Sequence, residues 1–372
     1  MKYYIIAGEA SGDLHASNLM KELKKLDSEA VFRCWGGDLM AGEGGRLVKH
    51  YRDLAFMGFF EVLIHLRTIL NNIRFCKKNI LDFRPDVVIL VDYPGFNLRI
   101  ARFVHDNGIR VFYYISPQLW AWRSSRAGTI KMNVDRMFVI LPFEKEFYKR
   151  FGYDVDFISH PLLDVINADL PLPDRRSFVG LNHLPDKPLI ALLPGSRKQE
   201  IKLMLETMLK VVPVFGNFHF VVAGAPSITP EFYSTIIKGA PVSVLTGQTY
   251  ELLHYSEAAL VTSGTATLET ALMNIPQVVC YKGNPLSFIL ARQIVRVNYI
   301  SLVNLVMDRE VIKELIQEHF TAKNLETELN LILSGSRRQE IMKSYAILRE
   351  KLGGRGASAK AARLMMQYLH NK

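Results

Sequence analysis

The chain has 372 residues, of which 49% are hydrophobic and 22% charged; this is enough for two globular domains with separate cores. No apolar run is long enough to span a bilayer, and the run at 2–7 is too short for a signal peptide, so we expect a cytoplasmic protein. The net charge of +10, concentrated in the first 150 residues, favours phosphorylated substrates or an anionic membrane face, and since no nucleic-acid-binding motif is present we expect no nucleic acid partner.

The first half of the chain alternates short β-rich runs with segments of helical periodicity. Apolar strands that are each followed by a helix indicate a parallel sheet with helices on both faces. Strands are predicted at 2–7, 30–34, 86–91, 110–115 and 136–141, and helices at 14–26, 57–80, 97–107 and 143–151.

The loop after the first strand reads Ala7-Gly-Glu-Ala-Ser-Gly-Asp13. Its glycines are four apart, so it is not the Gly-x-Gly-x-x-Gly fingerprint of a dinucleotide fold, and the chain has no Walker lysine motif either. Glu9, Ser11, Gly12 and Asp13 are candidates for the acceptor side of a site. Asp13 is equally well placed as the N-cap of helix 14–26.

Residues 57–78 combine an apolar stripe at helical spacing with basic residues. Such a helix can lie on an anionic membrane, but the same pattern is typical of an amphipathic helix packed on the sheet. Trp120 and Trp122 are further candidates for a membrane contact or an acyl groove. The membrane-facing candidates in the helix are Phe59, Phe60, Leu63, Leu66, Arg67, Leu70, Arg74, Lys77 and Lys78.

Asp92 follows the fully apolar run Val87–Val91. A carboxylate at the end of a buried strand is costly unless it has a partner or a chemical task. Asp92 is therefore the best candidate for a general base that accepts a proton from an attacking hydroxyl. The alternative is a structural acid that caps the next turn.

A passage rich in proline and charge, 170–176, separates the halves and is predicted to be the linker. We expect an N-terminal domain at 1–168 and a C-terminal domain at 175–350. A glycine-rich hinge at 353–356 then precedes a helix at 357–370, which packs on its own N-terminal domain or exchanges with a second subunit. In the second half, strands are predicted at 188–193, 218–223, 242–245, 258–262 and 277–281, and helices at 198–212, 229–237, 249–254, 265–273, 286–294 and 308–318.

Two glycine turns in the second half carry the most chemical information. Each follows an apolar strand and precedes a helix, whose free N–H groups and positive dipole end favour an anion. One turn contains Gly195, Ser196 and the fixed cation of Arg197, and the other contains Ser263, Gly264 and Thr265. Together they predict a diphosphate site rather than two ordinary capped turns.

A sugar nucleotide fits these turns, because its ribose would need a carboxylate and Glu269 lies one helical turn beyond Thr265. The alternative for Glu269 is a solvated acid that the helix dipole favours. No metal is expected. Asp154 and Asp156 form an acid-x-acid pair of the kind that can hold a metal, but they lie in a run that alternates polar and apolar residues, which is typical of a half-exposed strand. Cys34, Cys76 and Cys280 are isolated and lack the spacing of a metal site. We also expect no other cofactor.

With these residues in view, the sequence resembles the lipid-A-disaccharide synthase family, whose members are inverting glycosyltransferases of the GT-B architecture with two doubly wound α/β domains facing a cleft. The resemblance extends over essentially the whole chain. Its motifs are 7–13, 56–62, 85–87, 92–97, 116–123, 141–144, 193–197, 263–269 and 299–304.

The resemblance implies transfer of a sugar from UDP-2,3-diacylglucosamine to the 6-hydroxyl of 2,3-diacylglucosamine 1-phosphate. The products are a β-1,6-linked disaccharide 1-phosphate and UDP. It makes Asp92 a candidate base and relates Arg197 and Asn304 to the nucleotide. It also implies peripheral association with the inner face of the inner membrane, and a homodimer is one possible assembly.

Two alternatives from different classes stay open at this point. One is a UDP-N-acetylglucosamine 2-epimerase, or a transferase with a soluble acceptor, built on the same scaffold. The other is a non-enzymatic membrane or RNA-binding adaptor based on the basic first half, which would not consume a sugar nucleotide.

Overall fold

The structure is a computed structural model that describes residues 1–54, 66–122, 126–166, 172–284 and 298–371. The chain divides into two compact units. Unit 1 contains Met1–Asp164 and Leu352–Lys372, and unit 2 contains Val165–Lys351. The division falls four residues before the predicted end of the first domain, and part of the predicted linker lies outside the described residues.

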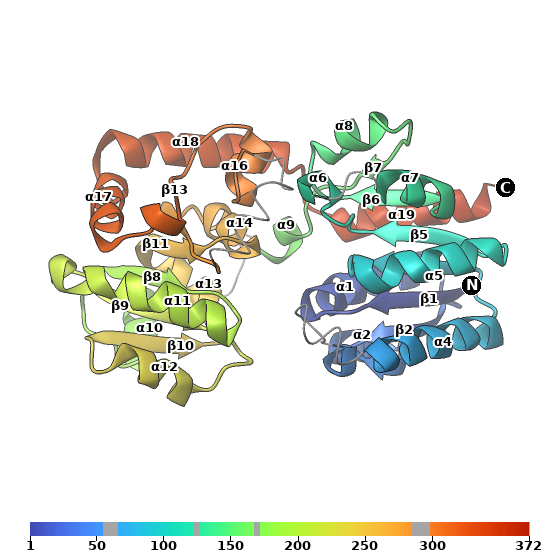
Figure 1. The fold of residues 1–372 in the computed structure, drawn as a ribbon, viewed down its shortest axis with the longest axis horizontal. Helices are drawn as coiled ribbons and strands as arrows, with labels where there is room; N and C mark the ends of the chain where they lie inside the picture. The colour runs from blue at the N-terminus through green and yellow to red at the C-terminus, as the bar shows by residue number, and fades with distance from the viewer. Residues whose placement is uncertain (55–65, 123–125, 167–171, 285–297, 372) are drawn as a thin grey trace. The chain divides into compact units, whose positions relative to one another are not determined.

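Unit 1 is built on a sheet of seven parallel strands in the order β3-β2-β1-β4-β5-β6-β7 (Figure 1). The strand order grows outward from β1 in one direction and from β4 in the other, so the topological switch point lies between β1 and β4. The strands are β1 (Lys2–Ala7), β2 (Val31–Gly36), β3 (Arg46–His50), β4 (Val87–Val91), β5 (Arg110–Tyr114), β6 (Arg136–Val139) and β7 (Asp156–Phe157).

Alternate residues of these strands point to opposite faces of the sheet, and each face has its own hydrophobic core. Tyr3 and Ile5 of β1 lie in the core that is shared with α1, α2 and α19, whereas Tyr4 and Ile6 lie in the core that is shared with α4, α5, α7 and α8. The helices are α1 (Ala10–Leu26), α2 (Asp38–Gly42), α4 (Leu66–Phe83), α5 (Pro94–Asp106), α6 (Leu119–Trp122), α7 (Arg126–Asn133), α8 (Glu144–Lys149), α9 (Leu162–Val165) and α19 (Ala357–His370), with a 3-10 turn η1 (Tyr51–Leu54).

The C-terminal helix α19 returns to unit 1 and packs against α1 of the same chain. Its start is held by Asp164, whose carboxylate accepts the backbone N–H groups of Gly356 (2.6 Å) and Ser358 (3.4 Å). Exchange of this helix with a second subunit stays a prediction.

Unit 2 repeats the architecture with six parallel strands in the order β10-β9-β8-β11-β12-β13, and its switch point lies between β8 and β11. The strands are β8 (Leu189–Leu193), β9 (His219–Gly224), β10 (Val242–Thr246), β11 (Ser256–Thr262), β12 (Gln277–Tyr281) and β13 (Glu314–Ile316). The helices are α10 (Arg175–Leu181), α11 (Lys198–Met208), α12 (Pro230–Ile237), α13 (Thr249–His254), α14 (Thr265–Leu272), α16 (Leu302–Met307), α17 (Ala322–Leu333) and α18 (Gly335–Lys351), with 3-10 segments η2 (Leu209–Phe215) and η3 (Gln317–His319).

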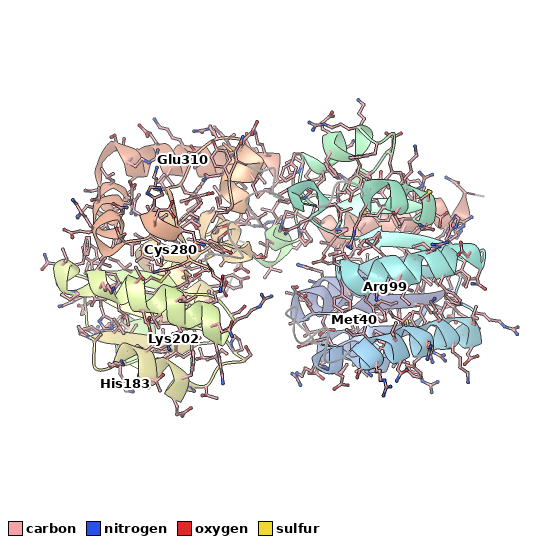
Figure 2. The ribbon with its side chains drawn as sticks, viewed as in Figure 1. Met40, Arg99, His183, Lys202, Cys280 and Glu310 are labelled. Atoms are coloured by element: carbon pink, nitrogen blue, oxygen red, sulfur yellow. The ribbon has the colours of Figure 1, made fainter. Side chains whose placement is uncertain are left out.

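Side chains that point into the layers between helices and sheet are buried, whereas charged side chains on the outer faces of the helices are exposed. Met40 on α2 and Cys280 on β12 are buried, whereas Arg99 on α5 and Lys202 on α11 are exposed (Figure 2). The two doubly wound α/β units confirm the predicted fold class.

The helix predicted at 308–318 is wrong. Residues 314–316 form β13 instead, paired in parallel with β12 from Val279 to Tyr281, and the helix of this region is α16, just before it. Pairing with a sheet edge outweighs the helical periodicity here. The helix predicted at 286–294 lies outside the described residues.

Candidate active site

The two glycine turns of unit 2 meet at one pocket of about 560 Å³ at its switch point. One turn follows β8 and the other follows β11, and these strands are neighbours in the sheet. Of the predicted donor-binding residues, those that line the pocket are Gly195, Ser196, Arg197, Ser263, Gly264, Thr265 and Glu269. Leu193 and the segment 223–226 complete its wall together with Glu200, Thr249, Thr262 and Ala266.

The turn after β8 is shaped by Gly195 and Glu200. Gly195 has a φ of +109°, which disfavours a side chain, and a Cβ at this position would collide with the carboxylate of Glu200. The backbone N–H of Ser196 donates to Oε2 of Glu200 at 3.0 Å. Arg197 is the exposed N-cap residue of α11. Sequence reasoning missed Glu200, although an acid three residues after an N-cap is a known capping signal.

The turn after β11 opens α14 with Gly264 as the N-cap. Gly264 has a φ of +157°, and the Ser263 hydroxyl donates to the carbonyl of Ile300 at 2.9 Å. The N–H of Thr267 already donates to the carbonyl of Gly264 at 3.2 Å. The N–H groups before it, at the first two helical positions Thr265 and Ala266, have no acceptor earlier in the helix and can bind an anion in the pocket. Two such turns and the Arg197 cation give this pocket the character of a phosphate site.

Glu269 lies one turn into α14, on the same helix face as Thr265. Burial raises the pKa of its carboxyl group above the usual range, and a hydrogen bond from Tyr250 opposes the shift. The Tyr250 hydroxyl donates to Oε1 of Glu269 at 3.2 Å. Glu269 is thus a half-buried acceptor on the pocket wall rather than a solvated acid.

Asn304, which was predicted to bind the nucleotide, is not among the residues that line the pocket. It is fully buried in unit 2. Its Nδ2 donates to the Ile312 carbonyl and to Glu314 Oε1, both at 2.9 Å, and its Oδ1 accepts the N–H groups of Val311 and Ile312. These bonds use its polar capacity, so Asn304 fixes the segment between α16 and β13 and does not offer a ligand contact.

In unit 1, Asp92 follows β4 at the switch point, with an unusual backbone. Asp92 and Tyr93 both have positive φ, 43° and 48°, a conformation that non-glycine residues rarely adopt and that clusters at functional sites. The Asp92 carbonyl accepts from the Tyr113 hydroxyl (2.6 Å) and from Asn97 Nδ2 (2.7 Å), and both side chains are fully buried. Sequence reasoning missed these two supports.

The Asp92 carboxyl group has a pKa that is raised to about 6, mainly by burial and next by the charge of Glu9. Glu9 follows β1, the strand beside β4, as the N-cap residue of α1. The two acids therefore lie close together at the carboxyl ends of adjacent strands. An acid with a pKa near 6 is ionised at neutral pH yet basic enough to accept a proton.

Of the other acceptor-side candidates, Ser11 is exposed, but Gly12 and Asp13 face the interior. A Cβ on Gly12 would lie 3.2 Å from that of Ala7, so Gly12 allows α1 to pack closely on β1. Asp13 accepts the backbone N–H groups of residues 37, 39 and 40, at 2.7 to 3.2 Å. The alternative in which Asp13 caps helix 14–26 is wrong, because α1 begins at Ala10 and Glu9 is its N-cap residue. Asp13 instead holds the start of α2.

A comparison with protein-family models matches residues 3–367 to the model described as lipid-A-disaccharide synthetase. The chain belongs to this family. Synthases of the family include one from Syntrophus aciditrophicus that is 42% identical over 96% of this chain and 95% of its own length, and one from Acidobacterium capsulatum that is 38% identical over 96% and 93%.

Solved structures with a similar fold come from both glycosyltransferases and epimerases. The S. aureus MnaA–UDP structure has a TM-score of 0.70 at 13% identity, covering 99% of this chain and 96% of that one. The UDP-GlcNAc 2-epimerase from Neisseria meningitidis has a TM-score of 0.66 at 13% identity over both full chains, and the glycotransferase of kitacinnamycin has 0.67 at 14%, covering 99% of each. These likenesses show the fold, whereas the family is that of the synthases, so the epimerase alternative is not favoured.

In this member of the synthase family, α4 presents a mixed outer face. Ile73 is buried in the core, so the apolar stripe of this helix faces the sheet in part. Lys77 lies over the ring of Phe103, 4.7 Å from its centroid. The exposed residues of the helix include Arg67, Leu70, Arg74, Phe75 and Lys78. Phe59, Phe60 and Leu63, and the side chains of Leu66 and Trp122, lie outside the described residues.

Among the described residues, no helix is long and apolar enough to cross a membrane. The described part of the chain also holds no cluster of three or more His, Cys, Asp or Glu residues that could bind a metal ion.

Asp156 accepts a hydrogen bond from the Tyr368 hydroxyl at 3.0 Å, and this contact ties β7 to α19. Trp120 packs edge-on against Phe143, with ring centroids 5.0 Å apart.

Proposed function

We propose that this lipid-A-disaccharide synthase transfers the sugar of UDP-2,3-diacylglucosamine to the 6-hydroxyl of 2,3-diacylglucosamine 1-phosphate, with inversion and without a metal ion or other cofactor. The observation that carries the proposal is the unit 2 pocket, where the two glycine turns, the Arg197 cation and the Glu269 carboxylate line one cavity. These groups match the parts of a nucleoside diphosphate.

The donor diphosphate is proposed to bind the turns at Gly195–Arg197 and Ser263–Thr265. Helix dipoles and the Arg197 guanidinium favour its charge, and they stabilise the additional charge that develops on the leaving UDP. Glu269 accepts hydrogen bonds from the ribose. The wall formed by residues 223–226 is then left for the uracil ring.

Asp92 is proposed to act as the general base. It takes the proton of the acceptor 6-hydroxyl while that oxygen forms a bond to C1 of the donor, and the bond from C1 to the β-phosphate oxygen breaks. UDP leaves with the bonding electron pair. A single displacement of this kind inverts the anomeric centre, and the charge on UDP is balanced by Arg197 and the helix starts in place of a metal ion.

The direct test measures UDP release from the purified chain given both diacylated substrates. We expect turnover that EDTA leaves unchanged, because the pocket's own groups neutralise the diphosphate. De-acylated donor and acceptor are the control, and they should react poorly. Complete loss of activity in EDTA that Mn²⁺ restores would overturn the metal-free mechanism, and equal rates with de-acylated substrates would overturn the substrate assignment.

The outer face of α4 is proposed to lie on an anionic membrane surface, where acylated substrates reside. Its exposed Leu70 and Phe75 stand among Arg67, Arg74 and Lys78, a pattern that suits an interface.

We expect the double change Arg74→Glu and Lys78→Glu to weaken binding to phosphatidylglycerol-containing vesicles by at least about tenfold, since each basic residue near such a surface contributes about 1 kcal/mol. Co-sedimentation measures the effect. The double change Lys145→Glu and Lys149→Glu, at two exposed lysines of α8, is the matched control for net charge and should have a smaller effect. Equal losses in both proteins would mean that α4 has no special role.

A further inference from the structure

Glu269 has an incomplete set of hydrogen bonds in the unit 2 pocket. A carboxylate offers about four acceptor positions. Among the residues that the structure describes, the only hydrogen bond to the Glu269 side chain comes from the Tyr250 hydroxyl, which reaches Oε1 at 3.2 Å. Because a half-buried charge needs hydrogen-bond partners, the remaining positions on the pocket side suit donors from a ligand.

Tyr250 is held in place by contacts of the residues before and after it in the chain. It is the second residue of α13, and Leu252 and Leu253 of this helix are fully buried in the unit 2 core. Gln248, the residue before α13, exchanges two hydrogen bonds of 3.0 Å with Asn182 after α10. The start of α13 is therefore anchored, and so is the ring that points to Glu269.

The Tyr250 hydroxyl is a donor throughout the working pH range. Burial and the neighbouring Glu269 charge both raise its pKa above the ordinary value for tyrosine. It therefore keeps its proton and stays directed at the carboxylate. The same hydrogen bond acts on Glu269 in the opposite sense, lowering a pKa that burial raises.

We infer that Tyr250 is a positioning residue for the nucleotide. Its hydroxyl fixes the rotamer and the ionised form of Glu269, so that the carboxylate's remaining lone pairs meet the ribose hydroxyls of a bound uridine nucleotide. This inference rests on the proposed function, because it needs UDP to bind in the unit 2 pocket. It adds a residue that neither lines the pocket nor belongs to its two glycine turns.

The test compares two ligands that differ only at the ribose. Isothermal titration calorimetry with UDP should show binding to Tyr250→Phe that is weaker than wild type by about 3- to 10-fold, the usual effect of one hydrogen bond. With 2′,3′-dideoxy-UDP, which has no hydroxyls for Glu269 to bind, wild type and variant should agree within about twofold. Tyr255→Phe is the matched control: Tyr255 follows the same helix and packs against Phe178, with ring centroids 5.1 Å apart, and its variant should bind UDP normally.

The pH dependence of UDP affinity gives a second test, because a residue that only packs would leave it unchanged. UDP affinity in the wild type should fall as Glu269 becomes protonated, and in Tyr250→Phe this fall should occur at higher pH, because the hydrogen bond that favours the carboxylate is gone. Equal weakening of both ligands, or no weakening of either, would overturn the positioning role. Failure of the wild type to bind UDP at all would instead contradict the proposed function.

Discussion

Asp92→Asn is expected to lower kcat by about 10²- to 10⁴-fold, the usual contribution of a general base. Asparagine keeps the shape of the side chain, and the carbonyl that Tyr113 and Asn97 hold belongs to the backbone, so the fold of the turn should survive. UDP affinity should not change, because every described residue that lines the proposed nucleotide pocket belongs to unit 2. Steady-state UDP release and calorimetry with UDP measure the two quantities separately.

Asp106→Asn is the matched control, since Asp106 is an exposed acid at the end of α5 in the same unit. It should have near-normal kcat. A kcat for Asp92→Asn within about threefold of wild type would remove Asp92 from the role of base. A loss of UDP affinity or of thermal stability in this variant would instead indicate a structural acid.

The pH profile offers an independent measure of the same group. A base must be ionised, and the pKa of Asp92 is raised to about 6 by burial and by Glu9, so kcat should fall as the pH decreases through about 6. Glu9→Gln removes the nearby negative charge. The pKa of Asp92 should then fall toward its ordinary value, and the acid limb of the profile should move to lower pH.

The sequence alone predicted the two strands that precede Asp92 and the first glycine turn. β4 and β8 are continuous apolar runs followed by turn residues, so their ends, and the polar groups placed there, were predicted within about two residues. The rule that ligands bind at the carboxyl ends of parallel strands then predicted a site at these strand ends. The strand order that puts β8 beside β11 is not encoded in any local pattern, and it came from the structure alone.

The predictions that failed concern residues whose hydrogen-bond partners lie far away in the sequence. Asp13 has the local signature of an N-cap, yet its partners lie 24 to 27 residues away at the start of α2. Asn304 is a polar residue in a helix whose role depends on Glu314 of β13, a strand that local periodicity had placed in a helix. Tyr113 supports Asp92 from the neighbouring strand, 21 residues away. Local propensity cannot report such contacts.

Arg197→Ala is expected to weaken UDP binding by about 30- to 100-fold, the equivalent of 2 to 3 kcal/mol for a charge-assisted contact. Arg197 stands at the start of α11, where Gly195 and Ser196 also line the pocket. Among the described residues that line the pocket it is the one cationic side chain, so its effect should follow the charge of the ligand. Calorimetry with uridine, UMP and UDP should show losses that increase in that order, with almost none for uridine.

Lys202→Ala provides the comparison within the same helix; Lys202 is labelled in Figure 2. It lies about one turn further along α11, is exposed and is not among the residues that line the pocket. The substitution removes the same net charge and should change UDP affinity by less than about twofold, since solvent screens a distant exposed charge. Arg197→Lys should recover part of the affinity, because an ammonium keeps the charge but not the planar donor pair. If uridine and UDP lost affinity equally in Arg197→Ala, the residue would be shaping the turn, and the diphosphate would have to be held by the two helix starts without it.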